Sequence, residues 1–364
     1  MKNKLLKGIG LSITSLFVSF SIGCGESNNE KTKIITTIFP EYDWVMNVLG
    51  DKKDSMDVSM LLDGGVDLHS YSPSPKDIIN ISNCDMFVYV GGESDEWVDD
   101  VLKDAKNKDM QVINLMEVLG DKAKEEELVE GMQGEDHDHE EGEDHDHEEG
   151  EDHDHEEGED HDHEDGEDHD HEEGEGHHHH HDDGEKEYDE HVWLSLKNSQ
   201  LFVDEIAKSL GEIDKDNADY YKNNAASYNN SLKDLDVKYG DAVKAGTKNT
   251  LLFADRFPFR YLVDDYSLNY YAAFIGCSAE TEASFETIAF LANKVDELNL
   301  NAIIKIESSD GKIANTVKNS TKNKNQNILT MDSIQSATTK EYKEGRNYLS
   351  IMTSNLDVLK EALK

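Results

Sequence analysis

The sequence predicts an α/β protein of two lobes, each a small and mostly parallel sheet flanked by helices, joined by one long rigid helix. Three observations carry this prediction. The chain has 364 residues, which exceeds one ordinary hydrophobic core and suggests two domains of roughly 150 residues each. Short apolar runs alternate with amphipathic stretches in both halves of the chain. Between the halves lies a long helical pattern that neither proline nor an internal glycine interrupts.

The first half of the chain is expected to form four strands and two helices. The apolar runs at 34–38, 55–62, 86–90 and 111–115 indicate strands. The stretches 42–49 and 75–81 indicate helices, the second of them starting at a proline. The strand runs are nearly continuous in apolar residues instead of alternating with polar ones. That composition is typical of parallel strands covered on both faces.

The middle of the chain predicts two helices, at 201–210 and at about 217–239. In the second, Tyr and Leu side chains recur at three- and four-residue steps, which is the spacing of one helix face. A helix of about 23 residues is ~35 Å long and crosses a whole domain. We interpret it as the link between the lobes, and a core helix within one lobe is the alternative.

The second half of the chain repeats the alternation of the first. Strands are predicted at 251–253, 270–274, 302–306 and 328–331, and helices at 259–265, 285–298, 311–319 and the C-terminus. Two α/β lobes follow from the repeated pattern. We place the N-terminal lobe at 33–213, the linking helix at 214–246 and the C-terminal lobe at 247–364.

The charge of the chain is strongly negative and unevenly spread. Lys and Arg number 35 against 80 Asp and Glu, a net charge of −45. Residues 134–184 hold 28 acidic and no basic side chains, so the other 313 residues carry a net of −17. No region is basic enough to bind nucleic acid through its phosphates. After residue 24 no apolar run approaches the ~20 residues of a membrane span.

The N-terminus is typical of an export signal. Three lysines among the first seven residues precede a short apolar stretch that ends at Cys24. The tetrapeptide Ser21-Ile22-Gly23-Cys24 resembles the lipobox of bacterial lipoproteins, although leucine is usual at the first position. This resemblance implies a signal peptide at 1–24, lipidation of Cys24, a polar tether at 25–32 and a protein anchored outside the bacterial membrane. The alternative is a plain secretory signal in which Cys24 is incidental.

Residues 134–184 contain five copies of an acidic octapeptide followed by five consecutive histidines. With a glycine every eight residues, few apolar side chains and like-charge repulsion, this insert is expected to be disordered. Its imidazoles, placed at i and i+2 among carboxylates, suit zinc, copper or nickel. We therefore predict a low-affinity metal-binding loop. Its 15 histidines are His137, His139, His145, His147, His153, His155, His161, His163, His169, His171, His177, His178, His179, His180 and His181.

Only two of the 17 histidines lie outside the insert, and both fall in connecting segments. His69 stands in GVDLHSYSPSPKDI, and His191 stands in DEHVWLS immediately after the insert. These segments resemble the two N-lobe histidine motifs of the substrate-binding lipoproteins of bacterial zinc and manganese ABC importers. The resemblance implies two α/β lobes joined by one long helix, a metal site in the cleft between them, and a membrane permease as partner. It implies a monomer and no enzymatic activity.

The same resemblance implies further metal ligands from the C-terminal lobe. Asp332, after the last predicted strand, matches one of them. Arg256 stands where the other is usual, and arginine has no lone pair for a metal. Asp255, Glu280 or Glu282 is then expected to supply an oxygen, or Arg256 to hold a carboxylate ligand in place. Three protein ligands plus water also satisfy zinc geometry.

The predicted function is capture of Zn²⁺ through His69, His191 and Asp332. Imidazoles favour zinc, and Mn²⁺ is the alternative if carboxylates dominate. The chain has no catalytic signature such as GxSxG, a P-loop or HExxH. A zinc hydrolase with Glu190 or Glu307 as base, and a metal-storage or adhesion lipoprotein, are the weaker alternatives. We interpret Cys84 as a small buried residue and predict no bridge to Cys277.

Overall fold

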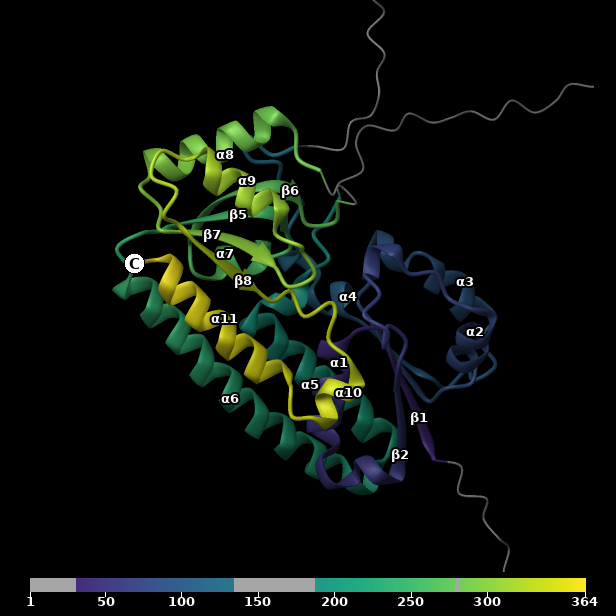
Figure 1. Ribbon diagram of the computed structural model, residues 1–364. Helices are drawn as coiled ribbons and strands as arrows, with labels where there is room; N and C mark the ends of the chain where they lie inside the picture. The colour runs from purple at the N-terminus through teal and green to yellow at the C-terminus, as the bar shows by residue number, and fades with distance from the viewer. Residues whose placement is uncertain (1–30, 134–186, 279–281) are drawn as a thin grey trace, which may run out of the picture. The chain divides into compact units, whose positions relative to one another are not determined.

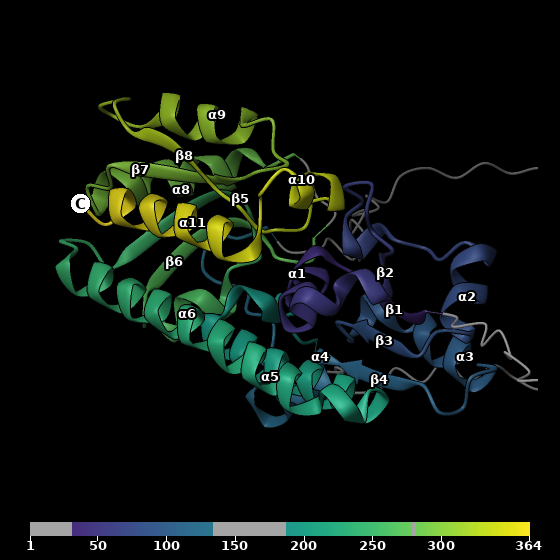
Figure 2. The same ribbon diagram turned by 90° about the horizontal axis from the view of Figure 1, so that it is seen from below.

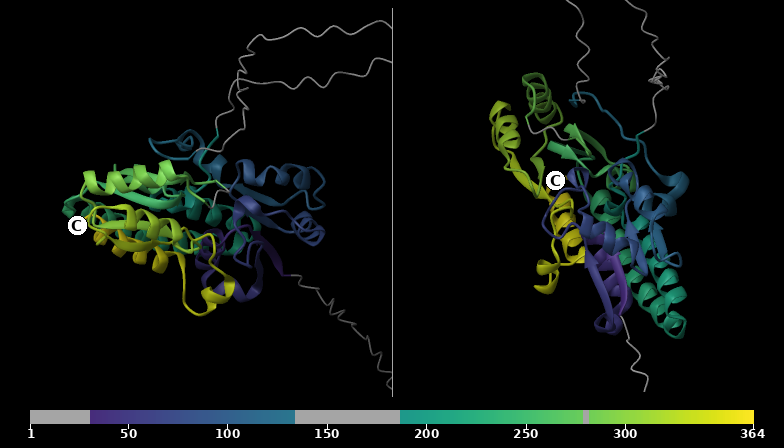
Figure 3. Two further views of the ribbon diagram at one scale, coloured as in Figure 1. Left: turned by 45° about the horizontal axis from the view of Figure 1, so that its top comes forward. Right: turned by 90° about the vertical axis from the view of Figure 1, so that its right-hand side faces the viewer.

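The computed structural model describes residues 31–133, 187–278 and 282–364. These residues contain two four-stranded sheets whose paired strands all run parallel, in the orders β2-β1-β3-β4 and β6-β5-β7-β8. Figures 1 and 3 show that the purple-to-blue strands and the green-to-yellow strands belong to separate sheets. The predicted pair of α/β lobes is confirmed.

The N-terminal sheet is covered on both faces, as its continuous apolar runs predict. Helices α2 and α3 pack on one face around Phe87, and α1 and α5 lie against the other. The strands are β1 Thr32–Thr36, β2 Met56–Met60, β3 Met86–Tyr89 and β4 Gln111–Asn114. The helices are α1 Phe39–Leu49, α2 Pro75–Ser82, α3 Trp97–Lys103, α4 Leu115–Leu119 and α5 Leu196–Ile213.

The C-terminal sheet has the same layered construction. Helices α8 and α9 pack on its strands with an apolar cluster that includes Leu252 and Leu291, and α11 contacts β7 and β8. The strands are β5 Thr250–Phe257, β6 Asn269–Ile275, β7 Ala302–Ile306 and β8 Asn327–Met331. The helices are α7 Arg260–Asp265, α8 Phe285–Glu297, α9 Lys312–Ser320, α10 Thr339–Lys343 and α11 Tyr348–Ala362.

Helix α6, Ala218–Ala245, joins the lobes as one unbroken helix of 28 residues. Figure 2 shows it with α5 beside it at one end and α11 alongside the rest. Tyr228 donates a hydrogen bond to Asp43 of α1 at 2.7 Å, and Tyr239 donates to the carbonyl of Met352 in α11 at 2.6 Å. Because buried bonds tie the helix to both lobes, the predicted linking helix is confirmed.

Three short helices were not expected from the sequence. These are α3, α4 and α10, of seven, five and five residues. A helix of one or two turns shows too little periodicity to be distinguished from a loop. The predicted strands and longer helices all occur, and their ends mostly move by a few residues, as fraying ends do.

Candidate metal centre

The structure brings His69 and His191 together although they are 122 positions apart in the chain. His69 lies in a 3₁₀ turn, Leu68–Ser70, and His191 directly precedes another, Val192–Leu194. Their Nε2 atoms are 3.2 Å apart. Two Zn–N bonds of 2.0–2.1 Å at a tetrahedral angle would place the nitrogens about 3.3–3.4 Å apart. The two imidazoles therefore already stand close to the separation of a zinc-ligand pair.

Each imidazole has polar partners at its other nitrogen: a carboxylate for His191, and a hydroxyl with a carboxylate slightly farther away for His69. Nδ1 of His191 is 3.0 Å from Asp189, and Nδ1 of His69 is 3.4 Å from Glu190 and 2.8 Å from the hydroxyl of Ser94. A histidine that donates Nδ1–H to a carboxylate presents the lone pair of Nε2 to a metal, with increased basicity. Both rings thus have the second-sphere partners of metal-binding histidines.

Local hydrogen bonds fix the two turns that carry the histidines. The Asp67 carboxylate accepts from the backbone N–H of His69 at 3.1 Å. The Asp189 carboxylate accepts from the backbone N–H of His191 at 2.8 Å, in addition to its contact with the ring. The Asp-x-His spacing shared by both motifs has one physical role, because a carboxylate two residues earlier holds the histidine backbone in its turn.

Gly276 leaves room for the second imidazole. A Cβ atom at this position would lie 2.9 Å from the carbonyl oxygen of Phe257 and 3.0 Å from Cε1 of His191. The first distance is shorter than Cβ atoms adopt and the second is tight, so a larger residue would require the backbone or the ring to shift. The backbone that follows β6 therefore packs directly on His191.

The centre is buried and acidic. The His191 side chain is fully buried, and 12% of the His69 side chain is exposed. Burial lowers the pKa of His191, but the carboxylates of Asp189, Glu190 and Glu126 together outweigh it, and the pKa lies above its usual value. Burial raises the pKa of Glu190, but the interactions with His69 and Ser94 lower it by more. The pKa therefore lies below its usual value, and the carboxylate stays ionised. The negative charges of Asp189 and Glu190 favour a cation at the two imidazoles.

Cys277 joins the two histidines, which the sequence did not predict. The metal-binding atoms of His69, His191 and Cys277 all lie within 4.8 Å of one another, and they form the one such group within the described residues. The sequence feature that could have indicated Cys277 is its position two residues after β6. Ligands of α/β proteins bind beyond the carboxyl ends of parallel strands. Both described cysteines are free, and Cys84 is buried in the N-terminal lobe, as its interpretation as a small buried residue predicts.

Arg256 contributes to the centre from its outer side. Its guanidinium donates to Asp67 at 2.8 Å, and Asp67 holds the backbone of His69. The neighbouring Asp255 turns away, because its carboxylate accepts from the backbone N–H groups of Arg256 and Ile306. Of the other predicted oxygen ligands, Glu282 is exposed and Glu280 lies outside the described residues.

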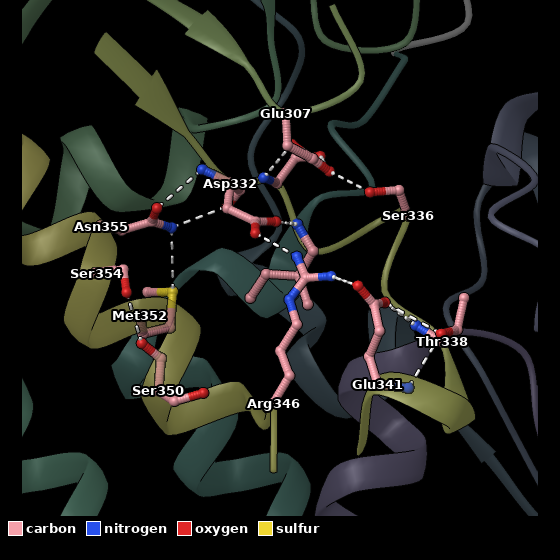
Figure 4. A network of polar contacts seen from close by, with 12 residues as sticks. Glu307, Asp332, Ser336, Thr338, Glu341, Arg346, Ser350, Met352, Ser354 and Asn355 are labelled. Atoms are coloured by element: carbon pink, nitrogen blue, oxygen red, sulfur yellow. Dashed lines mark hydrogen bonds and ion pairs between the residues drawn. The ribbon is translucent and has the colours of Figure 1, made fainter. Parts of the chain in front are cut away.

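Asp332 follows β8 as predicted, but its carboxylate is engaged elsewhere (Figure 4). Arg346 forms an ion pair with it at 2.5 Å, and the backbone N–H of Ile334 donates to its other oxygen at 2.8 Å. Arg346 also pairs with Glu341 at 2.7 Å. Asp332 is not part of the group of three metal-binding residues. Its role as a ligand stays a prediction, and it requires Arg346 to release the carboxylate.

The carboxylate of Glu307 lies beside this network and is also occupied. It accepts from the backbone N–H of Ser333 at 2.7 Å and from the hydroxyls of Ser333 and Ser336 (Figure 4). Burial raises the pKa of Glu307, and the charge of Asp332 raises it further. Three hydrogen bonds therefore hold Glu307 in the network around Ser333 and Asp332.

The predicted signal peptide, lipidated Cys24, most of the tether, and the histidine-rich insert lie outside the described residues. The chain on either side of the insert is described. Glu125 pairs with Tyr188 in an antiparallel bridge, and Gln133 pairs with Phe274 of β6. Within the described ranges, no helix is both long and apolar enough to cross a membrane.

Asp189→Asn is expected to weaken zinc binding by about ten- to a hundredfold. The amide keeps the shape of the side chain, but it removes the charge that increases the basicity of His191. Competition with a chromophoric chelator measures the affinity. Asp204→Asn is the matched control, because Asp204 accepts from Asn229 and has no contact with either histidine among its described bonds. Equal affinity in the two variants would contradict a role for Asp189 at the metal.

Comparisons with known proteins agree with the fold. The family model for the zinc-uptake complex component A, periplasmic (ZnuA), matches residues 34–362. Zinc-binding protein AdcA of Streptococcus pyogenes serotype M3 is 29% identical over 366 residues, covering 99% of this chain and 61% of its own length. The chain therefore spans about three fifths of that relative.

Two further comparisons cover nearly the whole of the matched protein. The high-affinity zinc uptake system protein ZnuA of Bacillus subtilis is 28% identical over 341 residues, which is 94% of this chain and 90% of that protein. The crystal structure of the Zn(II)-bound ZnuA-like domain of Streptococcus pneumoniae AdcA superposes with a TM-score of 0.63 at 24% identity. It covers 92% of this chain and 99% of that domain, so the likeness extends over both lobes.

Proposed function

The chain belongs to the family of the periplasmic zinc-uptake component A, and we propose that it captures Zn²⁺ outside the cytoplasm and delivers it to the membrane permease of an ABC importer. Proteins of this family are solute-binding receptors, which confirms the prediction that the chain is not an enzyme. The relatives are named as a zinc-binding protein and as a zinc uptake protein. The lipid anchor at Cys24 and a monomeric state are part of the proposal.

One observation carries the proposal for this chain's own residues. The Nε2 atoms of His69 and His191 face each other at 3.2 Å while both Nδ1 atoms face carboxylates. A metal-binding histidine almost always has a hydrogen-bond acceptor on its other ring nitrogen, and a carboxylate there also increases the basicity of the ring. Nitrogen ligands favour Zn²⁺ over Mn²⁺, which prefers oxygen. His69 and His191 are therefore the two ligands from the N-terminal lobe.

Uptake of radioactive zinc by bacterial cells tests the proposed function. Cells whose copy of this chain carries His69→Ala and His191→Ala should accumulate zinc as slowly as cells that lack the chain, when zinc is scarce. Cells carrying Asp204→Asn should accumulate zinc at the normal rate, since this change lies on α5 away from the histidines. Normal uptake by the double variant would refute the receptor function assigned to this site.

Zinc affinity is expected to fall as the medium is acidified. An imidazole must be neutral to bind a metal, so protons compete with zinc below the histidine pKa. Because the pKa of His191 lies above its usual value of about 6.5, the loss should begin above that pH and continue through it. A titration of affinity between about pH 7.5 and about pH 5.5 measures this effect. A flat curve over the range would mean that carboxylates alone hold the metal.

A further inference from the structure

Cys277 reaches the histidine pair from the opposite lobe. It follows β6 in the C-terminal lobe, whereas His69 follows β2 in the N-terminal lobe. The thiol sulfur lies within 4.8 Å of the metal-binding nitrogens of both histidines. A zinc ion with bonds of about 2.3 Å to sulfur and about 2.0–2.1 Å to nitrogen separates these atoms by about 3.6 Å. The sulfur and the nitrogens therefore need to approach one another by about 1.2 Å at most.

The structure around Cys277 holds the thiol at this place. The preceding residue, Gly276, packs against the ring of His191. The end of β6 is fixed by Gln133, whose backbone N–H donates to the carbonyl of Ala273 at 2.9 Å. The thiol interacts with the carboxylate of Glu126, and this interaction lowers the pKa of Glu126 against the effect of its burial.

Arg256 links the segments that carry His69 and Cys277. One terminal nitrogen donates to Asp67, two residues before His69, and the other donates to the carbonyl of Ser278 at 3.4 Å. By resemblance, Arg256 occupies a position where the family usually has a metal ligand, and arginine cannot bind a metal. In this chain Arg256 connects two neighbouring segments through hydrogen bonds. The C-terminal lobe therefore lacks the metal ligand that the family usually has at this position.

We propose that Cys277 supplies this missing ligand, so that one Zn²⁺ is held by two imidazoles and one thiolate. This assignment rests on the proposed zinc-receptor function and names the residue that the C-terminal lobe contributes to it. When the S–Zn bond forms, the S–H bond breaks and its proton leaves to solvent, and no oxidation or reduction occurs. The fourth position is taken by an oxygen, from water or a carboxylate. A thiolate also selects zinc over manganese, because soft ligands disfavour the harder ion.

Binding of less than one equivalent of Co²⁺ to the full chain tests the assignment. Cobalt takes the same tetrahedral sites as zinc, and a Co–thiolate bond gives a charge-transfer absorption in the near ultraviolet that imidazole and carboxylate ligands do not give. We expect this absorption in the unchanged protein and in the matched controls Cys84→Ser and Cys24→Ser. We expect it to vanish in Cys277→Ser, together with a loss of zinc affinity of more than about tenfold.

A second variant separates loss of the ligand from loss of the fold. Cys277→Asp keeps a metal-binding group, so it should still bind cobalt but without the charge-transfer absorption. Persistence of the absorption in Cys277→Ser or Cys277→Asp would overturn the assignment. If the chain without residues 134–184 binds cobalt, and the same shortened chain with His69→Ala/His191→Ala does not, yet the absorption is absent, Cys277 is not a ligand and the receptor function stands. If no tightly bound ion is found at all, both proposals fall.

Discussion

Replacing His69 and His191 together by alanine, in a chain without residues 134–184, is expected to abolish tight zinc binding. A four-ligand zinc site is worth roughly 10–16 kcal/mol, so two of its ligands account for roughly 5–8 kcal/mol. Affinity should fall by at least about a thousandfold. Removal of the insert is essential, because its 15 histidines would otherwise bind zinc and mask the loss.

Isothermal titration with zinc, in competition with a chelator, measures this effect. The comparison is the same shortened chain with both histidines intact, and circular dichroism shows that each variant is folded. The single variants should each lose more than about a hundredfold, since each removes one ligand and leaves its carboxylate unpaired. An unchanged affinity in the double variant would show that the site lies elsewhere in the chain.

Removing the insert itself is expected to leave one tight zinc site while impairing uptake only when zinc is scarce. The insert consists of near-equivalent His-Asp-His units, which should bind several ions weakly. Its C-terminal end at residue 184 is seven positions before His191, so ions bound there are held at high effective concentration near the histidine pair. We therefore propose that the insert collects zinc for the site.

A matched variant isolates the contribution of the imidazoles. Changing all 15 insert histidines to serine keeps the length and the carboxylates, and it should reproduce the uptake defect of the deletion. Zinc stoichiometry should drop from several ions to one in both variants, with the affinity of the remaining site unchanged. The collector proposal fails if the deletion abolishes tight binding in the purified protein, or if uptake under severe zinc limitation is normal.

Much of the fold could be predicted because both sheets are parallel and buried. Strands such as β3 are apolar at every position and stand out from amphipathic helices by composition alone. The linking helix was predictable from the regular spacing of Tyr221, Tyr228 and Leu235, which all face the core. Helix α10 was not predictable, because its five residues begin at the capping box of Thr338 and Glu341 and none of them is fully buried.

The candidate site was predictable only where local sequence determines it. The two histidines share an Asp-x-His turn that can be recognised in the sequence, and the structure brings them together. Cys277 was not recognised because its role depends on three segments that meet only in the folded chain. Asp332 was placed correctly after its strand, but the ion pair with Arg346, 14 residues later, follows from the path of the chain before α11. Long-range pairing of this kind leaves no local pattern.

Zinc-edge anomalous diffraction from crystals of the chain loaded with one equivalent of zinc tests the central claim most directly. The account predicts one strong anomalous peak, about 2.0–2.1 Å from Nε2 of both His69 and His191. The Nδ1 atoms should keep their contacts with Glu190 and Asp189. A peak bound to Asp332 and Glu307 without either histidine, or no peak between the two imidazoles, would contradict the account.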